Sequence, residues 1–272
     1  MSLYDRIHET ADFLRGHTSL ASQVAIILGS SLSDLVKAVE VEASIPYDQI
    51  PHFPQSTVEG HAGALIFGKL GGKAVVIMAG RFHYYEGYSM DEVTFPVRVM
   101  RALGAETLIV SNAAGGMNKD YTVGDIVLIR DHINLCPEHP LRGKNDERLG
   151  PRFPDMSEPY SLSMIALAVD IAREQSLDIK TGVYAGLQGP TFETRAEYAW
   201  LHGIGADLVG MSTVPEVIVA IHGGMKVFGA SIVTDIGIRE EMNTITHEEV
   251  LAAAAKAAPK LSRLIESLVG RL

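Results

Sequence analysis

The chain has 272 residues, of which 47% are hydrophobic, with a single cysteine and a formal net charge of −10. This length and apolar content can bury a large core, and because no linker, repeat or low-complexity run interrupts residues 1–272, we expect one α/β domain. The negative charge argues against nucleic acid or an anionic membrane as partner, and the lone Cys136 excludes a disulfide framework and a cysteine-cluster metal site.

The first 17 residues mix acidic and basic side chains with apolar ones at Leu3, Ile7 and Leu14. This spacing predicts an amphipathic helix instead of a signal peptide. No stretch approaches the roughly 20 consecutive apolar residues that span a bilayer. We therefore expect a cytoplasmic protein with no membrane partner.

Residues 24–28, VAIIL, form an apolar run typical of a buried strand. The run stops at Gly29-Ser30-Ser31, and a helix is predicted from about residue 33 to 41. Backbone N–H groups and the dipole at a helix start favour an anion, which makes Ser30 a candidate phosphate ligand. The alternative is that the serine is an ordinary helix cap.

Two apolar runs, residues 64–70 and 73–78, flank Gly71-Gly72 with the spacing of a two-residue hairpin, so the sheet is predicted to be mixed. The next segment places Arg81 and His83 two residues apart, on one face of an extended chain, where both can reach one anion. Alternatively, Arg81 is a surface charge and His83 a core imidazole. The aromatic residues around them favour a partly buried site.

Four helix starts show the capping pattern Ser/Thr-x-x-Glu. This pattern assigns the four glutamates a structural role instead of a catalytic one. The first of these helices contains Pro96, where a kink is expected, and ends at Gly104. The four pairs are Ser89 with Glu92, Thr194 with Glu197, Thr213 with Glu216, and Thr246 with Glu249.

The segment from Thr107 to Gly116, TLIVSNAAGG, begins as a buried strand and passes abruptly into small and polar residues. Ligands in α/β sheets gather at the carboxyl ends of such strands. Asn112 offers an amide there, and Ala113 and the residues after it are too small to obstruct a ligand. We interpret this strand end as a pocket floor, with a tight turn chosen for packing as the alternative.

Residues 131–160 show no helix or strand periodicity, which is typical of a lid, a binding loop or a subunit contact. Phe153 is the expected buried anchor of this loop. A helix follows at residues 161–176.

The remaining strands are predicted at residues 183–187, 208–210 and 227–233, before a closing helix at 246–268. Glu193, Ser212 and Asp235 each follow one of these strands. Glu193 precedes a capping threonine and is free to accept hydrogen bonds. Hydroxyl donors, carboxylates and aromatic faces at neighbouring strand ends are the parts of a site that binds phosphate beside a nitrogen heterocycle.

Taken in order, several motifs resemble those of the trimeric, low-molecular-weight purine nucleoside phosphorylases over nearly the whole chain. They are GRFHYYEGYS, SNAAGG, DHINL, PLRG-NDER-G-RFPDMS, GP-FET-AE, GMSTVPEVIVA and HEEVLAA. The resemblance implies the nucleoside phosphorylase fold, a central mixed, mostly parallel twisted sheet flanked by helices, and a homotrimer. It also implies reversible phosphorolysis of purine (2′-deoxy)ribonucleosides, with orthophosphate as co-substrate and neither metal nor cofactor.

The resemblance further implies three groups of site residues, with His83, Glu193 and Asp235 as the catalytic ones. Phosphate would contact Ser30, His61, Arg81, His83, Ala113 and Ser212. Ribose would contact Tyr85, Met211, His247 and, from a neighbouring subunit, Phe153. The base would contact Asn112, Phe192, Glu193 and Asp235.

Two positions depart from the family pattern. The loop after the first strand reads GSSLS, where the family usually has GSGLG, so Ser31 and Ser33 lack the backbone freedom of glycine. Asp235 stands where enzymes acting on 6-oxopurines carry asparagine. A carboxylate only accepts hydrogen bonds, so it favours a 6-amino group, whereas an ionised Glu193 favours the N1–H of 6-oxopurines.

Three other functions, two enzymatic and one non-catalytic, are alternatives to this interpretation. A 5′-methylthioadenosine phosphorylase would share the fold and the aspartate at 235, but it needs an apolar residue where the resemblance places His247. A nucleoside-binding protein without catalysis has no need of the phosphate-binding group. A nucleoside hydrolase would release base at the same rate without phosphate.

Overall fold

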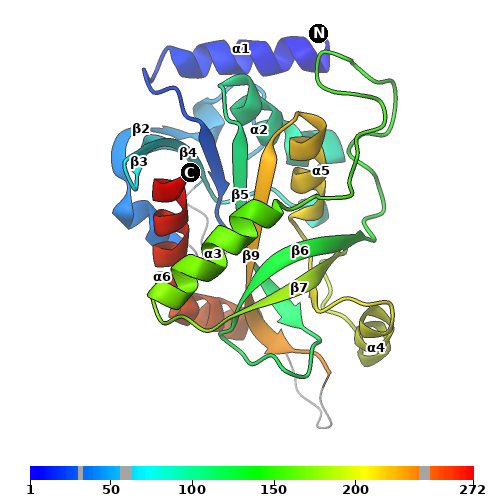
Figure 1. Ribbon diagram of the computed structural model, residues 1–272. Coiled ribbons are helices and arrows are strands. Elements are labelled where there is room, and N and C mark those ends of the chain that lie inside the picture. Colours follow the sequence, from blue (N-terminus) through cyan, green and yellow to red (C-terminus); the bar gives the residue numbers. More distant parts are fainter. Residues whose placement is uncertain (30–32, 56–62, 239–245) are drawn as a thin grey trace.

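The computed structural model describes residues 1–29, 33–55, 63–238 and 246–272 (Figure 1). The helices of this part of the chain are α1 Leu3–Arg15, α2 Met90–Ala102, α3 Leu162–Glu174, α4 Arg195–Gly203, α5 Val214–His222 and α6 His247–Arg271. The strands are β1 Val24–Ile27, β2 Glu40–Pro46, β3 Ala64–Leu70, β4 Lys73–Ala79, β5 Thr107–Gly116, β6 Ile126–Asn134, β7 Ile179–Gly186, β8 Leu208–Gly210 and β9 Lys226–Ile236.

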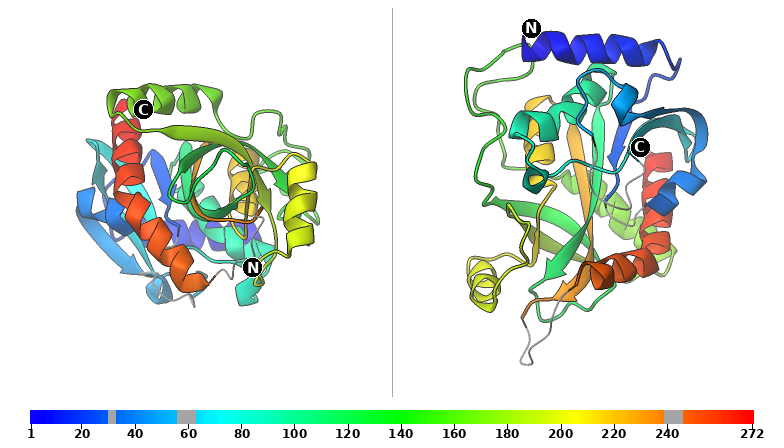
Figure 2. Two further views of the ribbon diagram at one scale, coloured as in Figure 1. Left: turned by 90° about the horizontal axis from the view of Figure 1, so that it is seen from below. Right: turned by 180° about the vertical axis from the view of Figure 1, so that it is seen from behind.

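The described strands form one mixed sheet in the order β2-β3-β4-β1-β5-β8-β7-β6-β9, which confirms the predicted α/β class. The hairpin of β3 and β4 is antiparallel, and its turn glycines Gly71 and Gly72 have φ of 55° and 80°, as predicted for a two-residue turn. Parallel pairing joins β4 to β1 and β1 to β5. Because β9 also pairs with β5, the second half of the sheet closes into a ring, seen from below in Figure 2.

The two central strands are longer than predicted. β5 continues to Gly116 and pairs along its length with β9, which itself continues through Asp235 to Ile236. Asp235 is therefore within a strand and not beyond its tip. On its other edge, β5 pairs with β1 as far as Val110 and with β8 only from Gly115 onward. The segment between these two pairings provides the open edge at which a pocket forms.

The helices cover the sheet in two groups. α1 packs on α2, and α2 on α5, while α3 and α6 pack together on the other side (Figures 1 and 2). The predicted capping boxes are present at Ser89, Thr194 and Thr246. The fourth is wrong: Thr213 makes no side-chain cap at α5, because its backbone turns sharply there, with φ of 71° and ψ of −56°.

Two further expectations need correction. The helix predicted at 33–41 is a short 3-10 helix, Ser33–Ala38, followed by the edge strand β2, whose partner β3 lies elsewhere in the sequence. The irregular segment begins only after Asn134, because residues 131–134 extend β6 alongside β7. No helix in the described ranges is both long and apolar enough to cross a bilayer.

Candidate active site

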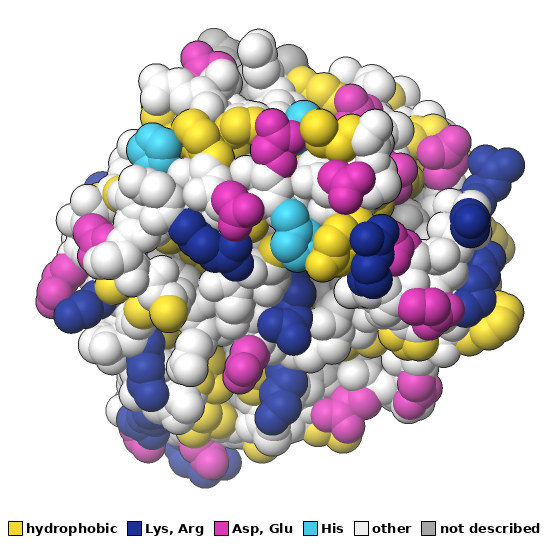
Figure 3. Space-filling view, turned by 90° about the horizontal axis from the view of Figure 1, so that it is seen from above, with side chains coloured by type: hydrophobic (Ala, Val, Ile, Leu, Met, Phe, Trp, Pro, Cys, Tyr) yellow, Lys and Arg dark blue, Asp and Glu magenta, His cyan; other side chains and the backbone are white. Residues whose placement is uncertain are grey.

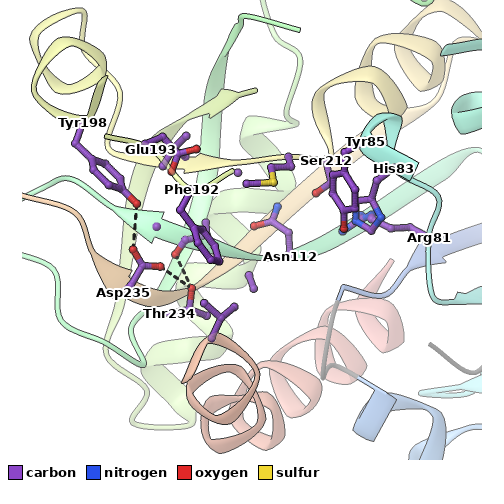
Figure 4. Close-up of a pocket in the computed structure, with 17 residues that line it drawn as sticks. Arg81, His83, Tyr85, Asn112, Phe192, Glu193, Tyr198, Ser212, Thr234 and Asp235 are labelled. Atoms are coloured by element: carbon purple, nitrogen blue, oxygen red, sulfur yellow. Dashed lines mark hydrogen bonds between the residues drawn. The ribbon is translucent and has the colours of Figure 1, made fainter. Parts of the chain in front are cut away.

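The pocket that holds most of the predicted site residues lies over the open edge of β5 (Figure 4). Its walls come from the segment after β4, from β8 and β9, and from the segment that leads into α4. Its lining includes Arg81, His83, Tyr85, Asn112, Ala113, Phe192, Glu193, Tyr198, Met211, Ser212, Thr234, Asp235 and Val250.

Arg81 is held rigidly at one end of this pocket. Its Nε and Nη2 atoms each donate to a carboxylate oxygen of Glu216 at 3.0 Å, and Nη1 donates to the Ser111 carbonyl at 2.6 Å. Arg81 and Glu216 are 1% and 2% exposed, so the pair is shielded from water. These bonds orient the guanidinium and use three of its five N–H groups.

His83 lies beside Arg81 at the same end of the pocket (Figure 4). Its Nδ1 is 2.9 Å from Oε1 of Glu86, and the same oxygen accepts the His83 backbone N–H at 2.8 Å. The imidazole stacks on Tyr85, with ring centroids 4.7 Å apart and planes inclined by 17°. The carboxylate of Glu86 and the ring of Tyr85 together fix the orientation of the imidazole. This orientation also fixes the position of Nε2, the other ring nitrogen.

A chain of hydroxyl and amide groups leads from β5 to the start of α5. Nδ2 of Asn112 donates to Oγ1 of Thr213 at 2.9 Å, and that oxygen is 3.1 Å from Oγ of Ser212. Thr213 is the centre of a tight turn in which the Val214 N–H donates to the Ser212 carbonyl at 2.7 Å. The turn presents the Ser212 hydroxyl to the pocket at a helix start, where an anion is favoured.

Two carboxylates occupy the opposite end of the pocket (Figure 4). Asp235 is 7% exposed and accepts from the Tyr198 hydroxyl at 3.3 Å and from the Thr234 hydroxyl at 3.1 Å. Burial raises the pKa of Glu193, and the charge of Asp235 raises it further, whereas hydrogen bonds, including one from Tyr198, oppose the shift. The pocket thus has a hydroxyl and cation end and a carboxylate end, with Asn112 between them.

The described lining of the pocket lacks four of the predicted residues. Ser30 and His61 fall outside the described residues. His247 begins α6 and is exposed, while Val250 of the same helix lines the pocket. The expectation that Phe153 is a buried anchor is wrong for the single chain, because its side chain is 87% exposed. Cys136 is half-buried and free, and burial raises the pKa of its thiol to about 11, as expected for an inert thiol.

The sequence did not reveal two residues of the site. The sequence pattern predicts a capping role for Glu216, and only the fold brings its carboxylate to Arg81. Tyr198 occupies an ordinary position in a predicted helix and carries no motif signal of its own. Among the described side chains, no group of three or more His, Cys, Asp and Glu residues is arranged to hold a metal ion.

A closed mixed sheet with a pocket divided between hydroxyl donors and carboxylates matches a known class of enzymes. The chain belongs to the phosphorylase superfamily, whose family model matches residues 23–270. Within it, the chain is 49% identical to purine nucleoside phosphorylase 1 of Geobacillus stearothermophilus over 97% of this chain and 96% of the relative. It is 50% identical to the Rattus norvegicus purine nucleoside phosphorylase over 98% and 94%.

Solved structures agree with the sequence comparison. A Schistosoma purine nucleoside phosphorylase in complex with hypoxanthine superimposes with a TM-score of 0.94 at 43% identity, covering 98% of this chain and 97% of the other. The Schistosoma mansoni enzyme in complex with adenosine gives the same TM-score, identity and coverage. The predicted resemblance is therefore confirmed in both sequence and fold.

Proposed function

We propose that the protein is a purine nucleoside phosphorylase, which transfers the pentose of a purine nucleoside to orthophosphate and releases the free base. The observation that carries this conclusion is the divided pocket, in a chain about half identical to enzymes of that name over nearly its full length. The hydroxyl and cation end suits an oxyanion. The carboxylate end suits the polarised N–H groups of a purine.

In this arrangement phosphate contacts Ser212, His83 and the outer edge of Arg81, together with Ser30, His61 and the Ala113 backbone. Ribose lies toward Tyr85 and Met211, and the base lies against Phe192. As the glycosidic bond stretches, positive charge grows on the sugar and negative charge on the purine. Phosphate then stabilises the positive charge on the sugar and bonds to its C1′ as the glycosidic bond breaks, and the proton that orthophosphate loses passes to the departing purine. Glu193 and Asp235 accept from the N–H groups of that base and orient it.

The same proposal extends to the assembly and its surroundings. In the homotrimer that the sequence motifs imply, the exposed Phe153 reaches the ribose end of a neighbouring subunit's pocket. The reaction needs orthophosphate and no further cofactor, because no electron transfer or metal-activated water enters it. The site of action is the cytoplasm.

Phosphate dependence tests the activity directly. We expect base release from inosine to fall close to zero in phosphate-free buffer and to return when phosphate is added. Ser212→Ala should lower the rate with phosphate by about 10²–10³. The matched control is Ser231→Ala, since Ser231 is a buried serine outside the pocket lining. Base release that is equally fast without phosphate would identify a hydrolase instead.

Asp235 sets the base preference in this proposal. Its oxygens accept from Tyr198 and Thr234 and can only accept from a ligand as well, so they favour a 6-amino group over O6. We expect Asp235→Asn to shift the ratio of kcat/KM values from adenosine toward inosine by at least about tenfold. No detectable adenosine cleavage, with a ratio unchanged by the substitution, would contradict this preference.

One observation supports a second candidate substrate. His247 is exposed, and α6 contributes the apolar Val250 to the pocket instead. An apolar side chain tolerates a thioether better than an unpaired imidazole does. 5′-Methylthioadenosine therefore belongs in the substrate panel, and a kcat/KM for it above that for adenosine would establish this alternative.

A further inference from the structure

Tyr198 belongs to the carboxylate end of the pocket, and neither the motifs nor the proposed roles account for it. It lies one turn into α4, and its side chain is directed at Asp235 (Figure 4). The residue is 3% exposed, and the hydroxyl donates to Oδ2 of Asp235 at 3.3 Å. The hydroxyl therefore contacts one of the two carboxylates to which the proposed function assigns the base.

Two glycines make space for this side chain. A Cβ at Gly237 would come within 2.3 Å of the Tyr198 ring carbons, a separation that real side chains do not tolerate. A Cβ at Gly115 would be 3.3 Å from the Tyr198 hydroxyl and 3.2 Å from Oδ2 of Asp235. The absence of a side chain at both glycines therefore leaves room for the tyrosine ring and lets its hydroxyl reach the carboxylates.

The hydroxyl has a single proton, and two carboxylates compete for it. Burial, followed by the charges of Asp235 and Glu193, raises the pKa of Tyr198 well above its usual value, so the phenol remains a donor. Burial raises the pKa of Glu193, and the charges of Asp235 and Glu197 raise it further. The hydrogen bond from Tyr198 lowers this pKa. The phenol thus offsets the repulsion between two negative charges.

We propose that Tyr198 is a positioning residue for base selection: by sharing its proton between Asp235 and Glu193, it keeps Glu193 able to accept the N1–H of a 6-oxopurine beside the carboxylate of Asp235. This inference rests on the proposed function and adds a determinant to it. Without the phenol, Glu193 takes up a proton at higher pH. A protonated Glu193 no longer accepts from N1–H but can donate to the bare N1 of a 6-aminopurine.

Tyr198→Phe tests this role, because it removes the hydroxyl and keeps the ring beside Gly237. The measurement is kcat and KM for inosine and adenosine in saturating phosphate from about pH 5 to about pH 9. We expect the acidic limb of kcat/KM for inosine to move upward by about one pH unit, which lowers kcat/KM by up to about tenfold at the acidic end of that limb. The loss should appear mainly in KM and should be smaller for adenosine.

The double variant Tyr198→Phe/Asp235→Asn separates this role from simple packing. Removing the charge of Asp235 removes the repulsion that the phenol offsets, so Tyr198→Phe should shift the acidic limb much less in this background. Tyr121→Phe is the matched control. Tyr121 is also a buried tyrosine; its hydroxyl donates to the Thr181 carbonyl at 2.9 Å, and it is outside the pocket lining.

Two results would overturn the inference. One is an equal loss for both substrates at every pH, which is the signature of a structural role. The other is the same pH shift with and without Asp235→Asn. Failure of the proposed function looks different, because the wild-type protein would then show no phosphate-dependent cleavage of either nucleoside.

Discussion

Glu216 and Glu249 occupy the same sequence pattern and have different roles. Glu249 closes the capping box of α6 at the surface, where its carboxylate accepts the Thr246 N–H at 3.2 Å. Glu216 is 2% exposed and neutralises Arg81 through two hydrogen bonds. The pattern describes local hydrogen bonding, but the partner of a buried glutamate depends on charges brought close by the fold.

This difference gives a prediction for stability. Glu216→Gln should lower the free energy of unfolding by about 3–5 kcal/mol, because it leaves the Arg81 guanidinium buried without a countercharge. It should also raise the KM for phosphate by releasing Arg81 from its orientation. Urea unfolding measures the first effect and steady-state kinetics the second. Glu249→Gln, the matched control, should cost under about 1 kcal/mol, and equal losses in the two variants would refute the prediction.

At the scale of elements, the junction between β8 and α5 carries backbone strain. Thr213 has φ of 71° and ψ of −56°, a conformation that costs a residue with a Cβ about 1–3 kcal/mol. The turn is maintained by the Val214 N–H bond to the Ser212 carbonyl and by the bond from Asn112 to the Thr213 hydroxyl. Its result is the position of the Ser212 hydroxyl in the pocket.

Comparison of two variants isolates that strain. Thr213→Ala and Thr213→Gly both lose the hydroxyl, but only glycine adopts the positive φ without strain. We expect the glycine variant to be the more stable by about 1 kcal/mol in chemical unfolding. At Thr122, which is not among the residues with positive φ, the order should be reversed. An alanine variant of Thr213 that is as stable as the glycine variant would show that the turn is unstrained.

At the scale of the whole molecule, charged side chains of both signs are spread over one face, whereas a single aromatic side chain in a long loop is strongly exposed. On the face over α1, basic and acidic side chains are interspersed, without a broad basic surface for a polyanion (Figure 3). Phe153, by contrast, is 87% exposed in a segment that contains no regular element. The proposed contact with a second copy of the chain would remove this ring from water, which is favourable for apolar surface.

Phe153→Ala tests this contact. We expect the free energy of unfolding of the chain to change by less than about 0.5 kcal/mol, because the ring is exposed, while the KM for nucleoside rises. Val123→Ala, at another exposed apolar residue, should change neither quantity. Mixing inactive Glu193→Ala subunits with Phe153→Ala subunits should restore some fully intact sites. Mixtures no more active than the sum of their parts would refute a shared site.

The predictions from sequence were best where a signal is local. Apolar runs indicated β1, β3, β4 and β7, since a strand buried on both faces reads as continuous hydrophobic sequence. Polar residues within long strands were harder to assign. Asp235 resembles a residue beyond the end of a strand, because nothing in its neighbours reveals that β9 continues along β5.

By itself, the sequence determined the α/β class, the hairpin, three capping boxes and the family motifs, all of which depend on residues close together in the chain. Only the tertiary structure decided that the sheet closes through β5 and β9, that Glu216 binds Arg81, and that Tyr198 faces Asp235. These pairs are separated by many residues. Their energies depend on distance and burial in space, which the spacing of residues along the chain does not specify.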